Sequence, residues 1–103
     1  MNKYPAYLIY SVHVDSHNPS IIDKVKALYH YNPDSRINTT REMTKHQVID
    51  LIRAGEECKT GVKDAGSYRV VNDVHVIKIY GEPFLKVKKS EEAKDDLGAL
   101  EKY

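Results

Sequence analysis

Apolar and polar residues alternate over residues 7–14 near the start of the chain. One side of an extended chain here carries Leu8, Tyr10, Val12 and Val14, and the other carries Tyr7, Ile9, Ser11 and His13. A period of two residues is typical of a β-strand, because successive side chains point to opposite faces. The pattern therefore predicts a strand over residues 7–14 with one strongly apolar side.

The stretch from Met43 to Gly55 changes to a helical period and contains signals for both ends of a helix. Thr44 is a favourable N-cap residue, and Gln47 lies three residues later, as a capping box requires. Met43 and Val48 have the spacing of a hydrophobic staple. Gly55 is a natural C-terminal stop. We therefore predict a helix over residues 45–54.

The apolar pattern of residues 21–31 fits two structures. Alternation predicts a strand, whereas Ile21, Val25 and Leu28 also fall on one face of a helix that Asn18 and Pro19 would start. The residues from Asn32 to Glu42 and from Glu56 to Gly66 are polar or contain helix and strand breakers, and they predict loops.

Three further strands are expected in the second half of the chain, over residues 68–71, 74–80 and 84–88. Apolar residues on both sides of residues 74–80 indicate a central strand. Asn72–Asp73 and residues 81–83 are expected to be turns. The charged tail over residues 90–103 is expected to pack back onto the sheet through Leu97 and Leu100.

This pattern predicts a small α+β domain with a single main helix on a mostly antiparallel sheet of about five strands, in the order ββαβββ. The chain has 103 residues, which favours one domain over residues 1–103 with a loose lead-in at residues 1–6. The single cysteine, Cys58, excludes an intrachain disulfide. The sequence contains no signal-peptide core and no run long enough for a membrane span, so we expect a cytoplasmic protein.

Four short motifs resemble the family of small bacterial proteins called domain of unknown function 3892. They are Leu51-Ile52-Arg53-Ala54-Gly55, Tyr68-Arg69-Val70, Phe84-Leu85-Lys86-Val87, and Asp95-Asp96-Leu97-Gly98-Ala99-Leu100. The resemblance implies a strand for residues 21–31 and supports the architecture. Val87, Asp96 and Glu101 depart from the family pattern. The family name implies no activity.

Several other groups of residues contain side chains that occur in metal or catalytic sites. His13, Asp15 and His17 lie on one side of an extended chain and are suitable zinc ligands, but no fourth ligand is indicated. Cys58 could act as a nucleophile with His46 or His75 as its base, but the spacing of these residues carries no family signature. Asp95 or Asp96 is expected to be a turn or cap residue that holds Leu97 in place. We therefore predict no metal, cofactor or catalytic residue.

Basic and aromatic residues on the later strands are the main candidates for binding. Lys78, Lys86 and Lys88 have the same parity, and Arg69 and Tyr80 lie nearby in the sequence. Such a face can stack bases and neutralise phosphates, or it can simply keep an open sheet soluble. The formal net charge of +1 provides only a weak long-range field for nucleic acid. The leading hypothesis is thus a non-enzymatic binding or protein-interaction module. The alternative is nucleic-acid binding through the Lys/Tyr face, and an open sheet edge also allows a homodimer.

Overall fold

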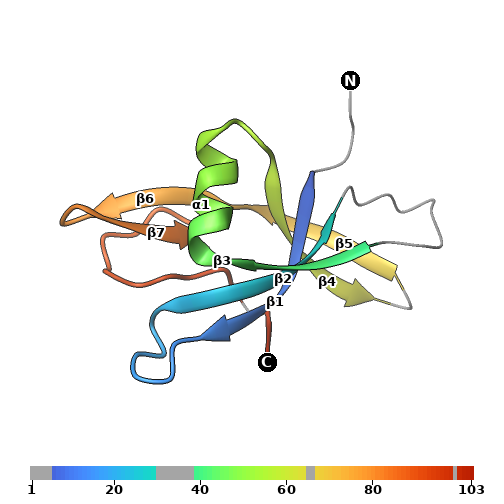
Figure 1. Cartoon of the computed structure of the whole chain (residues 1–103), viewed down its shortest axis with the longest axis horizontal. Helices are drawn as coiled ribbons and strands as arrows, with labels where there is room; N and C mark the ends of the chain where they lie inside the picture. Colours follow the sequence, from blue (N-terminus) through green and yellow to red (C-terminus); the bar gives the residue numbers. More distant parts are fainter. Residues whose placement is uncertain (1–5, 30–38, 65–66, 99) are drawn as a thin grey trace.

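The protein has an α+β fold in which one helix packs on a mostly antiparallel sheet (Figure 1). The computed structural model describes residues 6–29, 39–64, 67–98 and 100–103. In this part of the chain the elements are β1 (Tyr7–Val14), β2 (Ile22–Tyr29), β3 (Thr39–Thr44), α1 (Lys45–Arg53), β4 (Cys58–Asp64), β5 (Ser67–Asp73), β6 (His75–Ile79), β7 (Glu82–Lys86) and β8 (Glu101–Lys102).

The helix begins and ends where the local chemistry predicts. The Thr44 hydroxyl accepts a hydrogen bond from the Gln47 backbone N–H at 3.2 Å, and the Gln47 side chain accepts one from the Thr44 N–H at 2.9 Å. Ala54 caps the other end, and Gly55 follows with φ +91°. The predicted capping box and the predicted helix are confirmed, with α1 ending at Arg53.

The larger sheet is built around β1. Its strand order is β3-β2-β1-β4-β5, and β8 also pairs with β1, which gives six strands within the described ranges. The β1–β2, β2–β3 and β4–β5 pairs are antiparallel. The first half of β1 pairs in parallel with β4, and Ser11 and Val12 pair in parallel with β8. One strand therefore joins segments from the start, middle and end of the chain.

Residues 21–31 contain a strand, β2, as the resemblance implies. The predicted loop over residues 32–42 is wrong at its end, because β3 begins at Thr39; residues 30–38 lie outside the described part, as does nearly all of the predicted lead-in. The loop predicted over 56–66 is also wrong, because β4 occupies most of it. The Asn72–Asp73 turn is wrong, because both residues belong to β5.

The hairpin of β6 and β7 forms a separate two-stranded sheet, so the prediction of a central strand over residues 74–80 is wrong. Val76 packs against the main core, and Ile77 and Ile79 line a hollow with the segment that follows β7. The main core on one side and the segment after β7 on the other thus half-bury both sides of β6, which explains its apolar pattern. The turn predicted over residues 81–83 lies earlier, at Tyr80 and Gly81, because β7 begins at Glu82. The backbone has positive φ at both turn residues, 52° and 80°.

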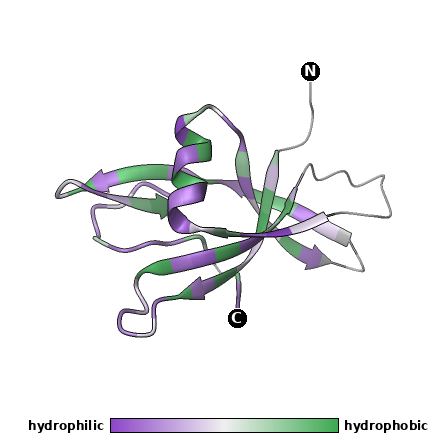
Figure 2. Ribbon diagram, viewed as in Figure 1, coloured by the Kyte–Doolittle hydropathy of each residue, from purple (hydrophilic) through white to green (hydrophobic). Residues whose placement is uncertain are grey.

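The main core lies between the larger sheet, α1 and the β6–β7 hairpin. Its most completely buried side chains include Ile9, Val25, Val48 and Leu85. Figure 2 shows hydrophobic and hydrophilic residues alternating along β2 and dividing α1 into two sides. Leu97 is 4% exposed and belongs to this core, and Leu100 packs against it.

Leu8 and Leu28 pair across β1 and β2 and form a second, smaller cluster with Tyr10 and Tyr68. Alternation along β1 places this cluster on the sheet face opposite Tyr7 and Ile9. We call this the outer face of the larger sheet.

Candidate functional site

A groove of about 600 Å³ opens at the N-terminal end of α1. In Figure 1 the β1–β2 turn and the β6–β7 hairpin project toward the same side of the molecule, with the start of α1 between them. These elements, with the start of β2 and the end of β3, line the groove with Asp15, Ile21, Ile22, Asp23, Thr44, Lys45, His46, Ile49, Glu82 and Pro83. We call it the α1 groove.

The α1 groove has an apolar floor. Ile22 and Ile49 belong to the main core and are 5% and 2% exposed, and Ile21 and Pro83 are half-buried beside them. The register of the sheet and the helical geometry of α1 fix these side chains, because Ile22 pairs with Val14 and Ile49 is a buried position of the helix. The apolar surface is therefore preformed.

The rim of the α1 groove is acidic. Asp23 is on β2, its side chain is 56% exposed, and its Oδ2 lies 3.5 Å from Nδ1 of His13 on β1. Glu82, also exposed, begins β7. Asp15 shapes the β1–β2 turn by accepting hydrogen bonds from the backbone N–H groups of His17 and Asn18. The Lys45 ammonium at the same rim is already paired with a buried carboxylate.

That carboxylate belongs to Asp95, whose side chain is fully buried. Its Oδ2 lies 2.8 Å from Lys45 Nζ and accepts the Ile22 N–H at 2.7 Å. Its Oδ1 accepts the Leu85 N–H at 2.8 Å. Charge-assisted bonds of this kind are short and strong. Asp95 therefore ties β2, α1 and β7 together beneath the groove and leaves Lys45 electrically balanced.

The prediction that Lys86 contributes to an exposed binding face is wrong. Its side chain is fully buried, and its ammonium donates to the Ser90 hydroxyl and to the backbone carbonyls of Ser90 and Glu92. A buried ammonium needs such acceptors, because it has lost its water shell. Lys86 thus fastens the segment after β7 and is not available to a ligand.

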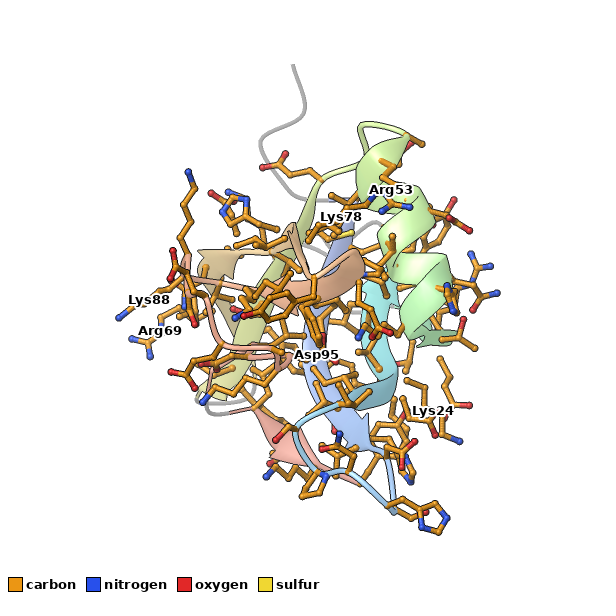
Figure 3. The ribbon with its side chains drawn as sticks, turned by 90° about the vertical axis from the view of Figure 1, so that its left-hand side faces the viewer. Lys24, Arg53, Arg69, Lys78, Lys88 and Asp95 are labelled. Carbon is orange, nitrogen blue, oxygen red and sulfur yellow. The ribbon has the colours of Figure 1, made fainter. Side chains whose placement is uncertain are left out.

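The other predicted binding residues are exposed but do not form a single patch. Lys78 and Tyr80 line a hollow of about 270 Å³ with Ile77, Ile79, Ser90 and Glu91, and Tyr80 is 97% exposed. In Figure 3, Lys78 lies toward α1, whereas Lys88 lies at the opposite side of the view. Arg69 lies on β5, which extends away from the hairpin in Figure 1.

A second hollow, of about 390 Å³, lies on the outer face of the larger sheet. It is lined by Tyr10, Val62, Lys63, Tyr68, Leu100 and Glu101. The rings of Tyr10 and Tyr68 are 5.2 Å apart. Burial, followed by the charges of Tyr10 and Glu101, raises the pKa of Tyr68. The alternation of Tyr10 with its neighbours was visible in the sequence, but β4 and β5 bring Lys63 and Tyr68 beside it only in the fold.

The groups of residues with side chains typical of metal or catalytic sites do not assemble in the described part of the chain. No group of three His, Cys, Asp or Glu residues there could hold a metal ion. Cys58 is buried on β4, and burial together with Glu56 and Glu57 raises the pKa of its thiol to about 11. A thiol with so high a pKa is a poor nucleophile near neutral pH. Asp96 accepts the Gly98 N–H at 3.0 Å, as expected for a turn residue beside Leu97.

No family model, curated protein or solved structure matches the chain. Among the described residues there is no helix with the length and apolar character needed to cross a membrane.

Proposed function

We propose that the protein is a non-enzymatic module of the cytoplasm that binds a protein partner in the α1 groove. The observation that carries this proposal is the groove itself: a preformed apolar floor of Ile22 and Ile49 with polar groups around it. Binding sites commonly combine an apolar surface of this size with a few polar groups that fix orientation.

The use of the polar groups around the groove supports binding in preference to catalysis. Lys45 and Asp95 form a buried ion pair, and Asp15 holds a turn. Both arrangements occupy the charged groups with structural tasks. The carboxylates of Asp23 and Glu82 are exposed at the rim, where they can contact a partner, although Asp23 also lies 3.5 Å from His13.

Photo-crosslinking in living cells tests this proposal. A photoreactive amino acid is placed at Glu82 on the rim and, as a matched control, at Glu56 beyond the end of α1. We expect discrete cross-linked protein bands from position 82 and none from position 56. The bands should weaken when Ile21→Ser is added. Equal cross-linking from both positions, or none from position 82, would contradict the proposal.

Nucleic-acid binding is the second candidate, and the hollow on the outer face of the larger sheet favours it. Tyr10 and Tyr68 supply aromatic rings for base stacking, and Lys63 supplies a cation beside them. This candidate predicts binding of a single-stranded oligonucleotide that falls steeply with salt and is weakened by Lys63→Ala. Lys88→Ala is the matched control, since Lys88 is exposed elsewhere. Salt-independent or absent binding would exclude it.

A further inference from the structure

We propose that the occupant of the α1 groove is a basic peptide segment in which lysine or arginine residues flank an aliphatic residue. This inference rests on the proposed function, because it specifies the partner of the same groove. Three features of the groove support it: the balance of charge at the rim, the separation of the carboxylates and the apolar floor.

The charge at the rim differs in sign from that of the whole chain. The chain has a formal net charge of +1 with histidine counted as neutral. The lining of the groove contains three carboxylates, on Asp15, Asp23 and Glu82, together with one lysine and one histidine, His46. A second histidine, His13, lies 3.5 Å from Asp23, and both histidines are counted as neutral here, as in the total for the chain. That lysine, Lys45, lies 2.8 Å from the buried carboxylate of Asp95, so its charge is already balanced. The rim is therefore a local negative site, which attracts a positively charged partner.

The three carboxylates come from separate places in the fold: the residue that follows β1, the start of β2 and the start of β7. They do not form a group that could hold a metal ion, and no such group of three His, Cys, Asp or Glu residues occurs among the described residues. A single cation cannot contact all of them. An occupant with several separated positive charges can do so, and a peptide with lysine or arginine at intervals has this arrangement.

The apolar floor specifies what lies between the positive charges. Ile22 and Ile49 form the base of the groove, and Ile21 and Pro83 rise beside it. Because Ile22 and Ile49 are only 5% and 2% exposed, a leucine or isoleucine side chain that enters the groove covers mainly Ile21 and Pro83, and it removes apolar surface from water on both partners. A purely polar polycation leaves the floor uncovered. The geometry thus requires both an aliphatic side chain and flanking cations.

Three synthetic nine-residue peptides test the inference by amide-resolved NMR titration. One alternates lysine and leucine, one replaces the lysines with glutamate, and one replaces the leucines with serine. With the lysine–leucine peptide we expect saturable shifts at Ile21, Asp23, His46, Ile49 and Glu82. The glutamate and serine peptides should each bind at least about tenfold more weakly, because each loses one half of the complementarity. Spermidine, a polycation without an aliphatic side branch, should also bind weakly.

Charge reversal at the rim provides the matched variants. The double variant Asp23→Lys with Glu82→Lys should weaken binding of the lysine–leucine peptide at least about tenfold. Glu56→Lys with Glu91→Lys makes the same change in net charge away from the groove, and we expect less than about a twofold effect. A dispersed NMR spectrum of each variant confirms that it is folded.

The outcomes separate this inference from the proposed function. If the glutamate peptide or spermidine binds in the groove as strongly as the lysine–leucine peptide, the inference of a basic and aliphatic occupant is overturned. The proposal that the groove is a binding site then still stands. Absence of saturable shifts at the groove with the lysine–leucine peptide also overturns the inference, whereas cross-linking from Glu82 then still supports a different partner. Equal weakening by both pairs of charge reversals shows nonspecific attraction and overturns the inference as well.

Discussion

Asp95 is a single side chain whose bonds join three distant elements. Its carboxylate contacts Lys45, the Ile22 N–H and the Leu85 N–H, and its side chain is fully buried. Replacing it with Asn keeps the shape but removes the charge, which leaves the Lys45 ammonium without its partner.

We expect Asp95→Asn to lower the free energy of unfolding by about 3 kcal/mol or more, because breaking a buried ion pair leaves an uncompensated charge. Urea unfolding measures the loss. The control is Glu57→Gln, which removes an exposed ion pair with Lys59 and should change stability by about 0.5 kcal/mol at most. Similar losses in the two variants would contradict the role assigned to Asp95.

Lys86 is the opposite case, a buried cation held by uncharged oxygens. Met has a similar shape, and it avoids the desolvation of the ammonium. For Lys86→Met we expect global stability to change by about 1 kcal/mol or less, while amide exchange accelerates at residues 88–92, whose Ser90 and Glu92 acceptors lose their donor. Hydrogen exchange detected by NMR measures both. Unchanged exchange in this segment would show that Lys86 does not hold it in place.

Cys58 should make the stability of the protein depend on pH, and its surroundings determine the direction of the change. Burial, then Glu56 and Glu57, raises the thiol pKa from 9.0 to about 11. The folded state therefore favours the protonated thiol. The stability that this thiol contributes is fully present below pH 9 and is lost as the pH rises toward 11. Between about pH 8 and about pH 10.5 we expect wild-type stability to fall about 2 kcal/mol more than that of Cys58→Ala. Urea unfolding across this range measures the difference, and parallel curves would refute it.

At the scale of elements, α1 is the segment in which local chemistry decides most. Thr44→Val removes the acceptor for the Gln47 N–H but retains a β-branched side chain for the end of β3. We expect it to lower stability by about 1 kcal/mol, whereas Thr44→Ser keeps the hydroxyl and should have little effect. Chemical denaturation measures both variants. An equal loss with Ser would show that the packing of the threonine methyl group, and not the cap, is responsible.

The helix was predictable from sequence because its signals lie within a few residues of one another. β3 and β4 were not, because Thr39–Glu42 is polar and Gly61 interrupts the pattern of β4. Their pairing partners are supplied by β2 and β1, and strand formation depends strongly on such partners. The α1 groove was missed for the same reason: Asp23, Lys45 and Glu82 are far apart in sequence and meet only in the fold. Nothing in the sequence around Lys86 indicated that Ser90 and Glu92 would enclose it.

At the scale of the whole molecule, β1 connects segments that are distant in sequence, and its contact with β4 depends on one small residue. A side-chain carbon added at Gly61 would lie 2.7–2.9 Å from carbon atoms of Leu8, which is fully buried. Gly61 therefore leaves the space that Leu8 fills, and the two residues fasten the β1–β2 hairpin to the β4–β5 hairpin.

A double-mutant cycle tests this coupling. Gly61→Ala alone should lower stability by about 1–3 kcal/mol through overpacking, and Leu8→Ala alone by about 2–5 kcal/mol through the cavity it leaves. In the double variant the added methyl group occupies part of that cavity, so the combined loss should be smaller than the sum by about 1 kcal/mol or more. Urea unfolding of the four proteins gives the coupling energy. Strict additivity would show that Leu8 relaxes away from the added methyl group without strain and that the small size of Gly61 is not what joins the two hairpins.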